Sequence, residues 1–168
     1  KSPTITRAIF AFLLLTNLNL MAVVAHSAKV GRGETKIMWL PKTASVAIVT
    51  GTLVQFDSGY VKQATTTAGA SDTPLVGIYV GPSITSASAN YATTDKIEVL
   101  VPKEPMTEFE IVVGTGSLAA TDVGKSFDID SDAEVTVSTT ANEAVTCTEY
   151  ISATLGKFVI TNLSSPAA

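Results

Sequence analysis

The residues best suited to hold a metal ion form an acidic run, in which Asp128, Asp130, Asp132 and Glu134 occupy alternate positions. This spacing imitates the start of a calcium loop, because Ca²⁺ binds carboxylate and carbonyl oxygens. The match then ends, since Ala133 stands where the sharp turn needs glycine, and residue 139 is a threonine where the bidentate glutamate belongs. We therefore predict a turn between two strands with its acids facing water, and assign no metal ligand.

Acid–base catalysis has few candidate residues. A nucleophilic triad needs a base that titrates near neutrality, and the only histidine, His26, lies in an N-terminal segment unlike the rest of the chain. Carboxylate pairs act in glycoside hydrolysis, but Glu98, Glu108, Glu110 and Asp122 occupy alternating strand positions or turns. We interpret these acids as a solvated strand face, because acids are mostly exposed. We expect no enzyme, no catalytic or cofactor-binding residue, no cofactor and no small-molecule substrate.

Two single residues have both a structural and a functional interpretation. Cys147, the one cysteine, lies in the alternating run 145–148, and we predict an inert strand position, because a reactive thiol needs electropositive surroundings. Trp39 suits an interface anchor, since tryptophan is enriched among interface hot spots. The structural interpretation of Trp39, a core aromatic in the first strand, is the one we favour.

The composition narrows the class of protein. Charged residues make up 15% of the chain, below the usual quarter, and polarity comes mostly from Ser, Thr and Asn. Such a surface is typical of proteins that pack into assemblies or act outside cells. The net charge is -4 and the lysines and arginines are scattered, which excludes direct nucleic-acid binding through clustered cations. No Gly-Lys-Ser/Thr phosphate loop is present.

The elements that must position these residues are short strands separated by turn signals, so the fold class is all-β, a compact β-barrel or sandwich of short antiparallel strands. Asp57, Ser58 and Gly59 form a hairpin signal, and residues 119–124 suit at most one helical turn. Residues 65–73 and 83–94 are expected to be small-polar loops. Strands are predicted at residues 35–40, 45–56, 60–64, 75–80, 96–101, 108–113, 126–129, 134–137 and 156–161.

The N-terminal segment differs from all that follows, and in isolation it is predicted to be a helix. Residues 8–15 and 20–25 are apolar after a basic start. Three interpretations stay open: a signal peptide, a transmembrane or packing helix opposed by Asn17 and Asn19, and non-native upstream translation of a protein that starts at Met21. We accordingly divide the chain into an apolar segment and arm, residues 1–34, and a single β domain, residues 35–168.

The serial order of several motifs resembles the small capsid decoration, or head-stabilising, proteins of tailed bacteriophages. None of the motifs is specific alone, and the likeness covers nearly everything from residue 36 onward. The motifs are residues 46–54 (VAIVTGTLV), 58–65 (SGYVKQAT), 75–78 (LVGI), 97–102 (IEVLVP), 121–129 (TDVGKSFDI) and 155–160 (LGKFVI).

The resemblance implies a compact β-barrel that binds the outside of an assembled capsid in the virion. The implied partner is the major capsid protein, and the implied oligomer is often a trimer. Bound decoration would stabilise the assembled shell over the open one by linkage, with residues 25–34 as an extended arm along the shell. A rival class is an exported cell-surface or adhesion β-sandwich module, which would use the N-terminal segment as a signal peptide.

Overall fold

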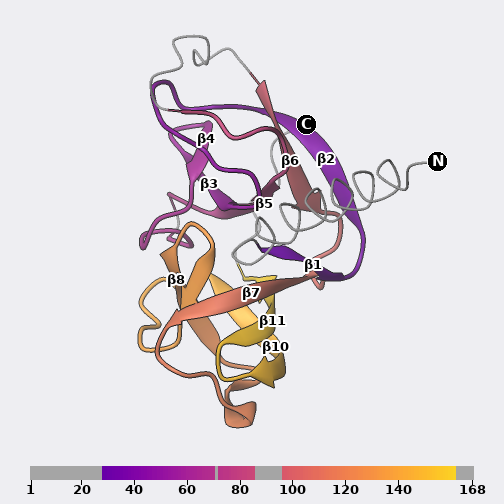
Figure 1. Cartoon of the computed structure of the whole chain (residues 1–168), viewed down its shortest axis with the longest axis vertical. Coiled ribbons are helices and arrows are strands. Elements are labelled where there is room, and N and C mark those ends of the chain that lie inside the picture. The colour runs from indigo at the N-terminus through magenta and orange to yellow at the C-terminus, as the bar shows by residue number, and fades with distance from the viewer. Residues whose placement is uncertain (1–27, 71, 86–95, 162–168) are drawn as a thin grey trace, which may run out of the picture.

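The computed structural model describes residues 28–70, 72–85 and 96–161, and it confirms the all-β fold class. Figure 1 shows two strand layers, a barrel and a second sheet, which lie at opposite ends of the molecule. Among the described strands every pairing except β7–β9 is antiparallel. The segment with Met21 and His26 and most of the loop at residues 83–94 lie outside the described residues.

The first sheet closes into a five-stranded barrel. Its strand order is β1-β7-β11-β10-β8-β9. β9, the last strand in this order, also pairs with β7 and so closes the ring. β1 lies on β7 outside this ring. The strands are β1 (Lys29–Arg32), β7 (Glu108–Thr115), β8 (Ser126–Ser131), β9 (Glu134–Thr136), β10 (Val145–Ser152) and β11 (Leu155–Ile160), with the 3₁₀ turn η1 (Ala120–Asp122) between β7 and β8.

The second sheet has the order β2-β6-β5-β3-β4. A single parallel bridge between Lys42 and Val61 joins the chain after β2 to β4. The β3–β4 hairpin turns at Ser58 and Gly59, whose φ angles of 53° and 85° are those that a tight hairpin requires. The strands are β2 (Thr35–Pro41), β3 (Leu53–Asp57), β4 (Tyr60–Gln63), β5 (Leu75–Tyr79) and β6 (Lys96–Pro102).

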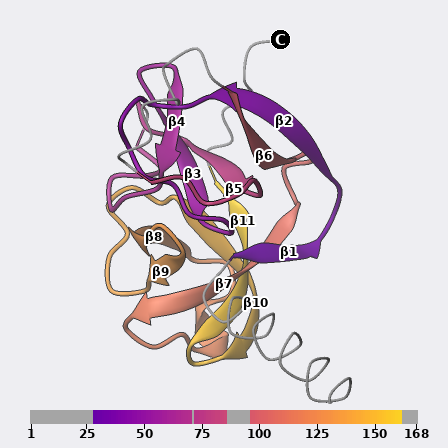
Figure 2. The same ribbon diagram turned by 45° about the horizontal axis from the view of Figure 1, so that its top comes forward.

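One hydrophobic core joins the barrel to the second sheet. Phe109 and Phe158 of the barrel are in the same buried cluster as Leu53, Leu75 and Ile78 of the second sheet. A smaller cluster, which includes Val54, Val76 and Tyr79, lies within the second sheet. β3 and β5 therefore contribute to both clusters, because their side chains alternate between the two faces. The shared cluster fixes the second sheet on the barrel, and Figure 2 shows the second sheet stacked on the barrel in a turned view.

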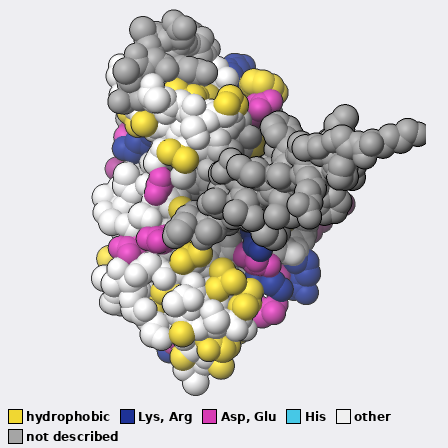
Figure 3. Space-filling view, viewed as in Figure 1, with side chains coloured by type: hydrophobic (Ala, Val, Ile, Leu, Met, Phe, Trp, Pro, Cys, Tyr) yellow, Lys and Arg dark blue, Asp and Glu magenta, His cyan; other side chains and the backbone are white. Residues whose placement is uncertain are grey.

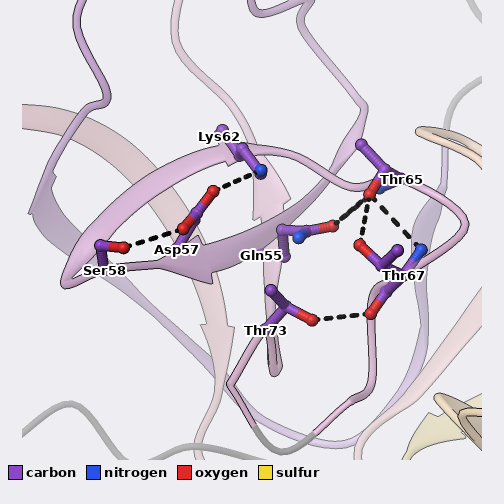
Figure 4. A network of polar contacts seen from close by, with 7 residues as sticks. All are labelled: Gln55, Asp57, Ser58, Lys62, Thr65, Thr67 and Thr73. Carbon is purple, nitrogen blue, oxygen red and sulfur yellow. Dashed lines mark hydrogen bonds and ion pairs between the residues drawn. The ribbon is translucent and has the colours of Figure 1, made fainter.

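A buried glutamine orders the small-polar loop that follows β4. The Oε1 atom of Gln55 accepts hydrogen bonds from the Thr65 backbone N–H at 2.7 Å and the Thr65 hydroxyl at 3.2 Å. The Thr73 hydroxyl donates to the Thr67 carbonyl at 2.6 Å and closes the loop (Figure 4). At the hairpin, Lys62 pairs with Asp57 at 2.5 Å. The loop is thus packed on the second sheet by its own hydroxyls.

Three elements differ from the sequence prediction. The strand predicted at residues 45–56 begins only at Leu53, the first residue of β3. The chain turns before β3, because Gly51 takes a φ of 85° and the Thr52 hydroxyl donates to the Val49 carbonyl. β10 extends to Ser152, well beyond the alternating run at residues 145–148. Lys29–Arg32, assigned to the extended arm, form β1 and pair with β7.

Candidate functional site

The acidic run lies at the β8–β9 turn, as predicted, but its first acid does not face water. Asp128 is 4% exposed. Its Oδ2 accepts the Ala141 N–H at 2.8 Å, and its Oδ1 accepts the N–H groups of Asn142 at 2.7 Å and Glu143 at 2.9 Å. The prediction of a solvated acid was wrong here, because the loop before β10 folds over this carboxylate. Asp128 therefore holds the chain's own backbone.

The other acids of the run have partners in different directions. The Thr115 hydroxyl donates to Asp130 at 2.5 Å, the Gln63 amide donates to Asp132, and the Ser131 hydroxyl donates to Glu134 at 3.2 Å. Among the described residues, no three Asp, Glu, His or Cys side chains converge as a metal site requires. The acids connect the β8–β9 turn to β7 and β4.

The burial of the Asp132 carboxyl predicts that the stability of the protein depends on pH. Burial raises the pKa of its carboxyl above the ordinary value of 3.8. The folded state therefore holds the proton more tightly, and stability is lost as pH rises from 3.8 through the folded pKa. Asp132→Asn should stabilise the protein by up to about 1 kcal/mol near pH 7 and change little near pH 3. Urea unfolding at both pH values measures this difference.

The control for that measurement is Asp72→Asn, which removes an exposed carboxylate. It should shift the free energy of unfolding by less than about 0.5 kcal/mol at either pH. Equal effects of Asp132→Asn at the two pH values would contradict the assignment of the effect to ionisation.

Charged pairs cross the outer face of the barrel and attach β1. Lys29 contacts Glu110 at 2.7 Å, and Arg32 contacts Glu108 at 3.1 Å. Across the next strands, Glu110 lies opposite Lys157, which contacts Glu149 at 2.6 Å. Opposite charges in register stabilise a sheet and set its alignment. The predicted solvated face was wrong for Glu108, which is 3% exposed because β1 lies against it.

The remaining candidate acids are separated from these pairs. Asp122 accepts the Ala119 N–H at 2.8 Å, and the Lys125 ammonium at 2.8 Å holds the pKa of its carboxyl below the usual range. Glu98 is half-buried on β6, opposite Trp39. The acids singled out in the sequence thus act as caps, clamps and cross-strand pairs in the part of the chain that the structure describes.

Cys147 lies in β10, as predicted, and is 1% exposed. Its Sγ atom is 3.7 Å from the Glu149 carbonyl, and burial raises the pKa of the thiol. A thiol that is both buried and protonated is a poor nucleophile.

We expect a neutral thiol reagent to leave Cys147 unmodified in the native protein at about pH 7.5, and to modify it completely in denaturant, because attack needs an accessible thiolate. Intact mass after timed labelling measures this difference. The denatured sample is the control, and rapid stoichiometric labelling of the native chain would contradict the inert assignment.

The strongest exposed feature is a pair of large apolar residues on β2. Ile37 is 56% exposed and Trp39 is 58% exposed, so the prediction of a core tryptophan was wrong. The two residues project from the same face of β2, since they are two apart. Their partners on β6 are the half-buried Leu100 and Glu98. The exposed Val80 extends this surface, because its backbone N–H donates to the Glu98 carbonyl. We call the surface formed by Ile37, Trp39, Leu100 and Val80 the β2 face.

An apolar hollow of ≈ 240 Å³ adjoins the β2 face, and Leu100 and Val80 line both. The hollow extends inward to Ile78, a member of the shared core, and to Ala28 and Val30 at the start of the described chain. The shared core is therefore continuous with exposed apolar surface. An exposed apolar patch of this kind is a candidate surface for contact with another molecule.

A second exposed apolar group lies at the far end of the barrel. Tyr150 is 39% exposed, Ile151 is 41% exposed, and Val123, beside η1, is 47% exposed. The β10–β11 register shifts between Tyr150 and Ser152, so Ile151 is a bulged residue. The bulge explains why two consecutive residues are both exposed, since strand neighbours otherwise face opposite sides. We call Tyr150 and Ile151 the hairpin patch; Val123 lies beside the same strand, because the Gly124 N–H donates to the Cys147 carbonyl. Hydrophobic side chains are also visible at this end in Figure 3.

Sequence reasoning missed Ile37 and the hairpin patch. The signal for Ile37 was present, because residues 37–40 are apolar without alternation, which suits either a central strand or a strand with a contact face. The bulge at Ile151 depends on pairing with β11 and has no local signal. Within residues 28–70, 72–85 and 96–161, no helix has the length and apolar character of a membrane span.

Comparison with known proteins adds no identification: no protein-family model matches the chain, and no curated protein matches it.

Proposed function

We propose that the chain is a virion structural protein that binds the outer capsid surface of a tailed bacteriophage and stabilises the assembled shell. The observation that supports this proposal is the pair of exposed apolar surfaces, the β2 face on the second sheet and the hairpin patch on the barrel, in two sheets joined by one hydrophobic core. A protein that holds neighbours together needs separate contact surfaces on a rigid body. The motif order described above points to the same class.

The mechanism is mechanical. A decoration protein that binds only the assembled shell lowers the free energy of that state by its binding free energy, and leaves the open state unchanged. We assign the shell contact to the hairpin patch, because Tyr150 supplies a large rigid ring and tyrosine is enriched at interface hot spots. Tyr150 lies on β10, which pairs with β11 and contributes Cys147 to the buried core, as β11 contributes Phe158.

The test is co-sedimentation of the full chain with shells of the major capsid protein encoded in the same genome. We expect the chain to pellet with the shells and to raise their disassembly temperature. A double variant, Tyr150→Ser with Ile151→Ser, should weaken binding at least about tenfold. Met106→Ser, at a residue 63% exposed in a loop between β6 and β7, is the matched control and should bind normally.

Failure of the unaltered chain to pellet with its cognate shell would overturn the proposal and favour an exported surface module. If the double variant bound as well as the unaltered chain, the proposed function would stand, but the shell contact would have to lie outside the hairpin patch.

A further inference from the structure

β2 is the longest edge strand in the described residues, and its protection against pairing is limited to Lys36 and the terminal Pro41. It spans seven residues, and its register with β6 runs from Thr35 to Pro41 without a bulge. β1, by comparison, has four residues, a register shift and two charged side chains, and β4 has four residues and the Lys62–Asp57 pair. Natural edge strands are usually short, charged or bulged, because an open edge is a template for another strand.

Two prolines determine which backbone groups of β2 point outward. Doubly bonded pairs alternate with unbonded pairs in an antiparallel ladder, and proline has no N–H. The pairs Thr35–Pro102 and Pro41–Lys96 are therefore pairs without backbone hydrogen bonds. Lys36, Met38 and Leu40 make the backbone hydrogen bonds to β6. The Lys103 N–H donates to the Glu34 carbonyl at 2.9 Å, and the Glu98 carbonyl accepts from Val80 on the other side, which agrees with this alternation.

It follows that Ile37 and Trp39 present both their backbone groups and their side chains at the open edge. Among the described residues, nothing pairs with this edge before the bridge at Lys42. An incoming strand would gain main-chain hydrogen bonds and apolar contacts at the same two residues.

We infer that the occupant of this edge is β2 of a second copy of the chain, paired antiparallel about a two-fold axis at Met38. In that register Ile37 of each copy lies opposite Trp39 of the other, in a doubly bonded pair. Aromatic and β-branched residues opposite each other are favourable cross-strand partners. The strand is thus complementary to itself, as a two-fold interface requires.

Charge agrees with this arrangement. Lys36, the one charged residue of β2, lies opposite Leu40 of the second copy, so no like charges meet. On the face that carries Leu100, the joined sheet has a row of Leu100, Ile37, then Trp39 and Glu98 of the second copy. An interface limited to two strands buries less than the roughly 1,200 Å² typical of stable complexes, so the dimer should dissociate on dilution.

This inference does not depend on shell binding, and it predicts a dimer where the phage resemblance implies a trimer. Light scattering on the full chain should give a mass that rises with concentration from 17.4 kDa toward twice that value and no further. Trp39 is the only tryptophan, so its emission should shift to shorter wavelength over the same concentrations.

Trp39→Lys should raise the dissociation constant at least about tenfold, since the substitution occurs twice in the interface and places a charge on the edge. Trp39→Thr introduces a β-branched residue, which suits a strand, and serves if the lysine variant fails to fold. Val49→Lys, which alters another exposed apolar residue outside β2 and β6, is the control and should dimerise normally. A concentration-independent monomer, a trimer, or a dimer unaffected by both Trp39 variants would each overturn the inference.

Discussion

Replacing Gly77 by alanine is expected to lower the free energy of unfolding by at least about 3 kcal/mol, a large share of the stability of an ordinary domain. A Cβ atom on Gly77 would lie 2.1 Å from the Leu100 carbonyl oxygen and 3.0 Å from the carbonyl carbon. These are backbone atoms of a paired strand, so the clash cannot be relieved by rotating a side chain. Urea unfolding followed by far-ultraviolet circular dichroism measures the loss.

The clash arises from the central place of β5 in the second sheet. β5 pairs with β3 and β6, and Val76 is bulged against β3, where Val54 lies opposite Gly77 and Gln55 lies opposite Leu75. The bulge brings the β6 backbone across Gly77, the kind of close approach that glycine in a strand permits. Separating β5 from β6 would disturb both hydrophobic clusters, because Ile78 belongs to one and Tyr79 to the other.

Gly59→Ala is the matched control. Gly59 has a φ of 85° in the β3–β4 turn, and a Cβ atom there would meet nothing within 4 Å. This variant should lose only about 1–2 kcal/mol, from left-handed backbone strain. If the two variants were equally stable, the Leu100 contact would not be the cause, and the close approach of β6 would have to be relieved at low cost.

Much of the fold could be predicted because its signals are local. The Asp57-Ser58-Gly59 turn and the runs at residues 35–40 and 96–101 each placed an element correctly, to within one residue at its end. The turn at residues 119–124 appears as η1. Such signals depend on backbone propensity and on a half-buried sheet surface, both of which can be read from neighbouring residues.

The remaining features depend on partners distant in the sequence. β1 is a strand because Lys29 and Arg32 meet Glu110 and Glu108, which lie more than seventy residues away. Trp39 is exposed because the core side of β2 is taken by Leu40. Alternation determines which residues share a face, but not which face is buried, so the core assignment of Trp39 was wrong.

The acidic run shows the same limit at the level of a candidate site. Its spacing suggested calcium, and the missing glycine argued against a calcium loop, but neither could show where the carboxylates point. Their partners, Gln63, Thr115 and the backbone after Thr140, come from three other parts of the chain. Long-range pairing therefore gives these acids a structural role that no local pattern encodes.

Removing the Asp128 carboxylate should be the second most damaging change. Asp128→Ala is expected to lower the free energy of unfolding by about 2–4 kcal/mol, because it leaves three backbone N–H donors, now bonded to a charged acceptor, without a partner. The loop it holds also includes Glu143, whose φ of 48° is unusual for a residue with a side chain and needs support.

The effect should extend from the loop to the junction of barrel and second sheet. The Asn142 amide donates to the Thr66 carbonyl at 3.0 Å, and Ala144 packs against Gly69, where an added Cβ would come within 2.6 Å of it. Releasing the Asp128 clamp therefore loosens the contact of this loop with the loop after β4. Hydrogen exchange should show faster exchange at Asn142 and Glu143 before any change in the strands of the barrel.

Two further variants separate the clamp from a general effect of lost charge. Asp128→Asn keeps one acceptor oxygen and should recover part of the stability, whereas Asp130→Ala removes a half-buried acid with a single hydroxyl partner and should lose about 1 kcal/mol. If Asp128→Ala were no worse than Asp130→Ala, or left the amides of Asn142 and Glu143 protected, the clamp would not hold the loop. The ordering Asp128→Ala, Asp128→Asn, Asp130→Ala, from most to least destabilising, is what a three-donor clamp requires.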